Sequence, residues 1–165
     1  MFTEELNGLA LRASSLLRAR GETVAVAEGS AGGLVSAALL SVPGASAYYV
    51  GGAVIYTAAA NRAFMAGAVE APRGMRGATE EFALYLAQCA LTRLEATWGV
   101  GEAGAAGPPN PYGHPSGHAW VAVSGPVAAT RHILTGSEVR VDNMVAFAAS
   151  ALTLLVTTLE RADSQ

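Results

Sequence analysis

The stretch from residue 23 to residue 40 constrains the fold most. Residues 23–27 form a short apolar run typical of a buried strand, and a turn of small residues follows at 28–33. Residues 34–40 are predicted to form a helix. This order of elements often binds anions, because the first N–H groups of a helix have no partners within the helix. The sequence therefore predicts an α/β protein with a candidate ligand site at this turn.

The remaining patterns extend the same architecture. Apolar residues at helical spacing, and short apolar runs bounded by turns, predict further elements on both sides of the turn. We expect helices at 3–20, 79–97 and 139–159, strands at 47–56 and 100–106, and a hairpin of strands at 119–124 and 127–134. Strands that alternate with helices favour a three-layer α/β/α sandwich, and the hairpin makes its central sheet mixed. We find no linker or repeat, so residues 1–165 are predicted to form a single domain.

Composition narrows the function classes. A hydrophobic fraction of 52% with 14% charged residues is typical of a globular chain. The net charge of −3 and the lack of a basic run argue against nucleic acid as a partner. Charged residues interrupt the long apolar stretches, so we expect no membrane segment, and the N-terminus does not resemble a signal peptide. The single cysteine, Cys89, suits a reducing cytoplasm, where we expect the protein.

The absence of lysine limits the possible chemistry. All ten basic residues are arginine. A guanidinium stays protonated in proteins, whereas a lysine amine can be deprotonated and act as a base. The sequence therefore excludes any mechanism that needs a lysine side chain.

Several segments resemble one known family. Residues 27–33, AEGSAGG, resemble the AESCTGG signature of the CinA C-terminal domain family. Residues 44–49 and 52–57 resemble the next two motifs of that family, and residues 104–108 match a later one. The resemblance runs in register over nearly the whole chain. It implies the three-layer fold. Some family members are fused to a larger N-terminal domain, and the resemblance implies that this chain is the stand-alone form.

The resemblance also implies an activity. Characterised members hydrolyse nicotinamide mononucleotide to nicotinic acid mononucleotide and ammonia, without a metal or an organic cofactor. It implies that Ser46 is the nucleophile and that Tyr56 supports it, although a serine in such a turn is otherwise a plain turn residue. Asn61 stands where the family has the lysine that deprotonates the serine, and an amide cannot accept that proton.

The implied ligand-binding residues cluster in three segments. They are Glu28, Gly29, Ser30, Ala31, Gly32, Gly33, Ala105, Ala106, Gly107 and Glu138. Glu28 has two open interpretations: it caps the next helix, or it orients a catalytic group. Glu138 and Asp142 stand where the family has arginines, so we expect weaker binding of a phosphate. Glu28, Ser46, Tyr56 and Asn61 are predicted to converge on one cavity bordered by residues 105–108.

Two functions follow from these residues. The first is an amidohydrolase whose activity on nicotinamide mononucleotide is weak, altered or absent because the lysine is missing. The alternative is an inactive ligand-binding or interaction module. His114 remains a substitute base, because the imidazole pKa lies near neutrality. His114 and His118 alone are a weak metal signal, and we expect no metal. The low charged fraction predicts a homodimer or a larger homo-oligomer.

Overall fold

A computed structural model describes residues 3–109 and 113–162. Its centre is a five-stranded sheet with the order β2-β1-β3-β4-β5. The strands are β1 (Val24–Glu28), β2 (Tyr49–Val54), β3 (Trp98–Ala105), β4 (His118–Ser124) and β5 (Ala129–Leu134). β1 pairs in parallel with both β2 and β3, whereas β4 is antiparallel to β3 and to β5. The sheet is therefore mixed, as predicted.

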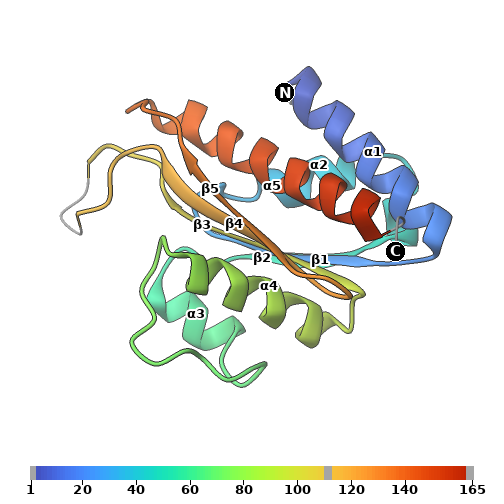
Figure 1. The fold of residues 1–165 in the computed structure, drawn as a ribbon, viewed down its shortest axis with the longest axis horizontal. Helices are drawn as coiled ribbons and strands as arrows, with labels where there is room; N and C mark the ends of the chain where they lie inside the picture. The colour runs from blue at the N-terminus through green and yellow to red at the C-terminus, as the bar shows by residue number, and fades with distance from the viewer. Residues whose placement is uncertain (1–2, 110–112, 163–165) are drawn as a thin grey trace.

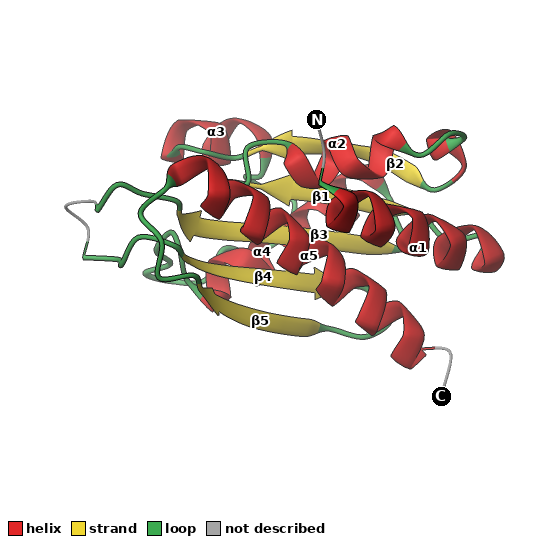
Figure 2. Cartoon of the chain, turned by 90° about the horizontal axis from the view of Figure 1, so that it is seen from above, coloured by secondary structure: helices red, strands yellow, loops and turns green. Residues whose placement is uncertain are grey.

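Helices cover both faces of the sheet. One face carries α1 (Glu4–Arg20), α2 (Leu34–Ser41) and α5 (Arg140–Ala162), and the other carries α3 (Ala58–Phe64) and α4 (Glu80–Leu94) (Figure 1). A short 3₁₀ segment, η1 (Ala45–Ala47), precedes β2. Figure 2 shows α1 and α5 side by side above the strands. The predicted three-layer α/β/α sandwich is confirmed.

Local capping explains why most element boundaries were predicted closely. The Thr3 hydroxyl accepts a hydrogen bond from the Leu6 N–H at 3.2 Å, and Gly21 ends α1 with φ of 64°. Thr79 caps α4 in the same way. The short helix α3 was not predicted, because none of its residues is buried and it therefore has no apolar stripe.

The two faces of the sheet pack differently. Large aliphatic and aromatic side chains fill the space under α1, α2 and α5, whereas the α4 face is rich in alanine. A Cβ atom at Gly99 or Gly101 of β3 would lie 1.9 Å from a carbonyl oxygen of α4. Glycine is needed at both positions because the backbone of α4 lies directly on β3. Cys89 is buried in this layer, and burial raises the pKa of its thiol, which fits the predicted core role.

Helix α5 corrects one expectation. Of the described helices, it alone is long and apolar enough to cross a membrane by length and composition. The expectation that charges interrupt every such stretch is wrong, because residues 143–159 contain none. In the fold, 56% of its most apolar stretch is buried, and α5 packs against α1 and β4. These contacts are those of a core helix.

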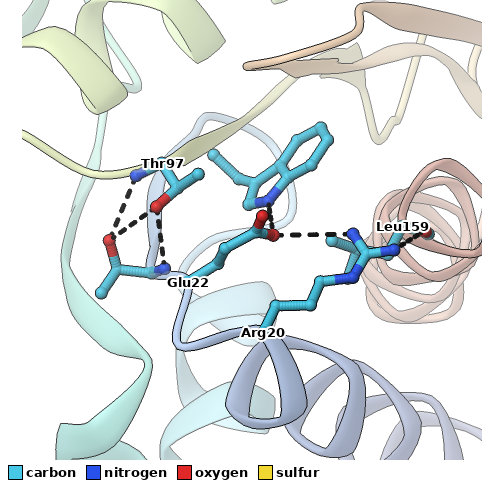
Figure 3. Close-up of polar contacts among 6 residues, drawn as sticks. Arg20, Glu22, Thr97 and Leu159 are labelled. Carbon is cyan, nitrogen blue, oxygen red and sulfur yellow. Dashed lines mark hydrogen bonds and ion pairs between the residues drawn. The ribbon is translucent and has the colours of Figure 1, made fainter. Parts of the chain in front are cut away.

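A network of polar contacts lies at the amino ends of the parallel strands. The indole N–H of the fully buried Trp98 donates to Glu22 Oε2 at 2.7 Å, and Arg20 lies 3.5 Å from the same oxygen (Figure 3). Arg20 also donates to the Leu159 carbonyl oxygen. This network joins the end of α1 to the start of β3 and to α5.

Candidate functional site

A cavity of about 800 Å³ opens at the carboxyl ends of β1, β2 and β3, opposite the network of Glu22 and Trp98. Each strand delivers residues to it, because the three parallel strands point the same way (Figure 2). Six of the residues that line the cavity can take part in its chemistry. They are Ser30, Tyr56, Arg76, Gly107, His114 and Arg140. Ala105 and Ala106 also line it, as the sequence predicted for residues 105–107.

The glycine-rich turn binds a carboxylate of the protein itself. The N–H groups of Gly29 and Ala31 donate to Glu102 Oε2 at 3.0 and 2.7 Å, and Ser30 Oγ donates to Glu102 Oε1 at 2.5 Å. Gly32 and Gly33 have φ of 68° and 98°, which the tight turn requires. The N–H groups that the sequence predicted to be open to a ligand are therefore used inside the protein, those of the turn by Glu102 and those at the start of α2 by Glu28. Of the turn residues, only Ser30 lines the cavity.

Glu102 has an unusual environment for a carboxylate. Its side chain is fully buried, and no salt bridge to it is found within residues 3–109 and 113–162. Burial raises its pKa to about 7, and the neighbouring Glu28 carboxylate adds to the rise. Hydrogen bonds from Ser30, Ala31 and Gly29 act in the opposite direction. Glu102 therefore changes its protonation state near neutral pH.

Glu28 serves as the cap of α2. Its carboxylate accepts hydrogen bonds from the N–H groups of Val35 and Ser36 at 3.1 and 2.9 Å, and from Ser36 Oγ at 2.7 Å. The N-cap residue Gly33 has no side chain that could do this. Glu28 is fully buried and does not line the cavity. Of the two interpretations from the sequence, the geometry shows the helix cap, and Glu28 is not among the residues that line the cavity.

Arg140 connects the start of α5 to the ends of two strands. It donates to Tyr56 Oη at 2.9 Å and to the Gly107 carbonyl oxygen at 2.6 Å. Its guanidinium also lies 5.8 Å from the centre of the Tyr56 ring. Because Tyr56 Oη accepts this bond, the phenol proton remains available to a ligand. Arg140 and Arg76 therefore give the cavity positive charge.

Three histidines form a cluster beside the cavity. His118 Nε2 lies 2.9 Å from the Ala78 carbonyl oxygen, and His118 Nδ1 lies 2.7 Å from His132 Nε2. The carbonyl requires a donor, so His118 Nδ1 accepts from the N–H of His132. His114 stacks on His118 with ring centres 5.3 Å apart. Both nitrogens of His118 are engaged, and residues 3–109 and 113–162 contain no group of three histidine, cysteine or acidic side chains placed so that it could hold a metal ion.

The structure corrects the predicted position of the nucleophile. Ser46 lies in η1, before β2 begins, and its side chain is exposed. Tyr56 follows the other end of β2, at the cavity. A strand advances about 3.3 Å per residue, so the full length of the six-residue strand β2 lies between Ser46 and Tyr56. The prediction that Ser46 converges with Tyr56 is therefore wrong.

Two further predicted residues lie outside the cavity lining. Asn61 belongs to α3, and its side-chain oxygen is buried without a hydrogen-bond partner among the described residues. Glu138 is exposed and does not line the cavity either. The charged residues that do line it, Arg76 and Arg140, were not predicted. Neither Glu138 nor Asp142 lines the cavity, and the weaker phosphate binding expected from them stays a prediction.

Sequence reasoning also missed Glu102. A signal for it existed, because a single carboxylate inside an otherwise apolar predicted strand needs partners when it is buried. Arg76 and Arg140 gave no such signal. One lies in a loop and the other at a helix start, and either position is ordinarily solvent-exposed.

Comparisons with known proteins agree with the fold and the motifs. The sequence model of the CinA C-terminal domain matches residues 6–159. A CinA-like protein of Anaeromyxobacter sp. (strain Fw109-5) is 39% identical over 92% of this chain and 37% of its own length. A CinA-like protein of Prochlorococcus marinus (strain MIT 9313) is 38% identical over 67% of this chain and 26% of its own. The chain thus spans between a quarter and two fifths of the length of these relatives.

Solved structures show the same architecture. The crystal structure of competence/damage inducible protein CihA from Agrobacterium tumefaciens superposes with a TM-score of 0.87 and 28% identity, covering 97% of this chain and 98% of its own. A CinA superfamily protein from Klebsiella pneumoniae 700603 superposes with a TM-score of 0.86 at 23% identity, covering 94% and 98% of the two chains. Together with the family match over residues 6–159, these likenesses establish that the chain belongs to the CinA C-terminal domain family.

Proposed function

We propose that the protein hydrolyses the carboxamide of a small phosphorylated ligand, of the class of nicotinamide mononucleotide, in the cavity at the carboxyl ends of β1, β2 and β3. The observation that carries this proposal is the placement of the Ser30 hydroxyl, the Tyr56 phenol and two guanidinium groups around one cavity. Its volume of about 800 Å³ lies within the range of small-molecule sites.

The positive charge suits the phosphate of such a ligand. Arg140 is held by Tyr56 and by the Gly107 carbonyl through two of its N–H groups, which leaves other donors of the guanidinium for an anion. Arg76 comes to the same cavity from the loop before α4. Guanidinium groups bind phosphate oxygens with paired, charge-assisted hydrogen bonds. A phosphate between Arg76 and Arg140 therefore anchors the ligand.

The hydroxyl groups suit the amide of the ligand. Ser30 supplies a nucleophilic oxygen, and Tyr56 supplies a proton donor that Arg140 orients. A donor of this kind stabilises the negative charge that develops on a carbonyl oxygen when it is attacked. Ser46 cannot take part, because it lies before the amino end of β2, whereas the cavity lies at the carboxyl ends of the strands.

The test is ammonia release from nicotinamide mononucleotide by the purified protein. We expect Ser30→Ala to lower kcat by roughly 10³-fold, because it removes the nucleophile. Ser46→Ala is the matched control and should retain activity within about twofold, since it makes the same change far from the cavity. Activity that survives Ser30→Ala and is lost in Ser46→Ala contradicts the proposed site. A protein that releases no ammonia contradicts the proposed reaction.

Self-association remains a prediction. Val50 and Val54 on the edge strand β2 are each 45% exposed, and Phe64 of α3 is 56% exposed. Exposed apolar side chains of this kind favour association with another chain. Light scattering at micromolar concentration should show a dimer or a larger oligomer, and a stable monomer contradicts the prediction.

A further inference from the structure

We infer that Glu102 is the general base of this protein and that Ser30 is the nucleophile it activates, so that a serine–glutamate pair takes the place of a serine–lysine pair. This inference rests on the proposed amide hydrolysis in the same cavity. The chain contains no lysine that could accept the proton of the attacking serine. The inference assigns this proton transfer to Ser30 and Glu102.

The geometry of the pair fits proton transfer. Glu102 Oε2 is fixed by the N–H groups of Gly29 and Ala31, so Glu102 Oε1 is directed at the Ser30 hydroxyl, which donates to it at 2.5 Å. Three donors on one carboxylate favour its ionised form, which is the form that accepts a proton. The base is therefore held in position by backbone groups of the turn that carries its nucleophile.

Gly104 keeps the nucleophile accessible. A Cβ atom at this position would lie 2.7 Å from Ser30 Oγ and 2.6 Å from Ala119 Cβ. Gly104 and Ser30 both line the cavity. A side chain at 104 would cover the Ser30 hydroxyl, so the glycine leaves a path from the cavity to it.

The charges around the pair fit the same role. Burial raises the pKa of Glu102 to about 7, close to the pH at which a base both accepts and returns a proton efficiently. The neighbouring titratable or charged groups are Glu28 on β1 and, around the cavity, Arg76, His114 and Arg140. Glu28 favours the protonated form of Glu102. No hydrogen bond joins His114 to Ser30 among the described residues, so His114 is the weaker candidate for the base.

The reaction balances with water as the only co-reactant. Ser30 Oγ attacks the amide carbon while its proton moves to Glu102, and the carbonyl electron pair moves to oxygen. When the carbonyl re-forms, the C–N bond breaks and the nitrogen takes the proton from Glu102, so that ammonia leaves an acyl-serine. Water then attacks the acyl carbon and gives a proton to Glu102. The C–Oγ bond breaks, Ser30 regains its proton, and the products are a carboxylic acid and ammonia.

The test measures the reactivity of Ser30 without any substrate. The full-length protein is treated with a fluorophosphonate, which phosphonylates activated serines, and the labelled residue is found by intact mass and peptide mapping. We expect labelling at Ser30, with a rate that rises as the pH increases through about 7 and then levels off. Glu102→Gln should slow labelling roughly 10²-fold at pH 8 and abolish this rise. Glu102→Asp keeps a carboxylate and should restore part of the rate.

The controls separate this inference from the proposed function. Ser30→Ala should remove the label, and Ser46→Ala should leave it unchanged. Labelling at Ser30 that depends on Glu102, in a protein that releases no ammonia from nicotinamide mononucleotide, supports the pair and contradicts the proposed substrate. No labelling at Ser30, or a labelling rate that is the same in wild type and in folded Glu102→Gln across pH 5–9, overturns the inference. If Glu102→Gln does not fold, the wild-type pH profile and Glu102→Asp decide in its place.

Discussion

The two edges of the sheet hold a carboxylate in opposite ways. At the amino-terminal edge, Glu22 accepts the indole N–H of Trp98 and pairs with Arg20. At the carboxyl ends of the parallel strands, the described residues that hold Glu102 are the neutral donors of residues 29–31, while Arg76 and Arg140 line the cavity. At the amino ends of the strands, the charges of Glu22 and Arg20 are paired, and their contacts join α1, β3 and α5. At the carboxyl ends the charges are kept apart, which leaves a carboxylate able to titrate near neutrality and guanidinium groups able to bind a ligand.

This contrast has a consequence for stability. A carboxylate that is buried without a cation disfavours its charged form, whereas a carboxylate paired at an edge does not carry that penalty. Buried Glu102 at the cavity should therefore lower the free energy of unfolding at neutral pH. The network of Glu22, Arg20 and Trp98 should raise it. Substitutions of Glu102 and of Glu22 should therefore change the free energy of unfolding in opposite directions at neutral pH.

The largest expected effect is that of Glu102→Gln on stability. The pKa of Glu102 is raised from 4.5 to about 7 in the folded protein. Between these values the folded state binds a proton that the unfolded state has released, so the free energy of unfolding falls as pH rises. The loss is complete above pH 7 and is on the order of 3 kcal/mol. Glu102→Gln should therefore be more stable than wild type at pH 8 by urea unfolding, and the gain should vanish near pH 4.

Glu22→Ala should have the opposite sign. It removes the acceptor of the Trp98 indole N–H, and Trp98 is fully buried. Leaving such a donor without a partner costs about 2 kcal/mol. The control is Arg12→Ala, which breaks the ion pair of Arg12 with Glu160, whose side chains are 55% and 43% exposed, and should cost less than about 1 kcal/mol. Equal losses in both variants would show that the edge network contributes no more than a surface ion pair.

Arg140→Gln tests the charge of the cavity. It removes a guanidinium from the proposed phosphate site, so KM for a phosphorylated amide should rise roughly tenfold. Because Arg140 also orients the Tyr56 phenol, kcat should fall as well. The matched control is Arg131→Gln on β5, which removes the same charge from a residue that does not line the cavity. A rise in KM of equal size for the corresponding unphosphorylated nucleoside would contradict a phosphate contact.

Glu28→Gln gives the smallest effect and couples the helix cap to the base. It weakens the hydrogen bonds to the N-terminus of α2, at a cost of about 1 kcal/mol in unfolding free energy. It also removes the like charge beside Glu102, so the pKa of Glu102 should fall. The midpoint of the labelling rate against pH should therefore move to lower pH. A midpoint that moves upward would contradict the arrangement of the two carboxylates.

The sequence was sufficient for the architecture because periodicity reports burial. Helical stripes and short apolar runs between turns predicted every described strand and all α-helices except α3, which buries no residue. Caps such as Thr3 and Gly21 act within a few residues of the chain, so they too can be recognised from the sequence. Of the ligand-binding residues that the family motifs implied, Ser30 and residues 105–107 line the cavity.

The site was predicted only in part, because its geometry depends on strand direction and on distant contacts. Ser46 and Tyr56 flank a single strand, and the two ends of a strand lie at opposite edges of a sheet. The positions of Ser46 before the strand and Tyr56 after it therefore already place these two residues apart. No local pattern, however, places Arg140 beside Tyr56, which is 84 residues away in the chain.

The sequence by itself therefore determined the three-layer fold, the family and the absence of a lysine base, because each of these depends on residue type and spacing. The tertiary structure decided which groups meet. Only the pairing of β1 with β3 brings Glu102 beside Glu28 and under the turn of residues 29–31, 71 to 73 residues earlier in the chain. The physical reason is that the pKa of a buried carboxylate depends on desolvation and on neighbours across the sheet, which local sequence does not specify.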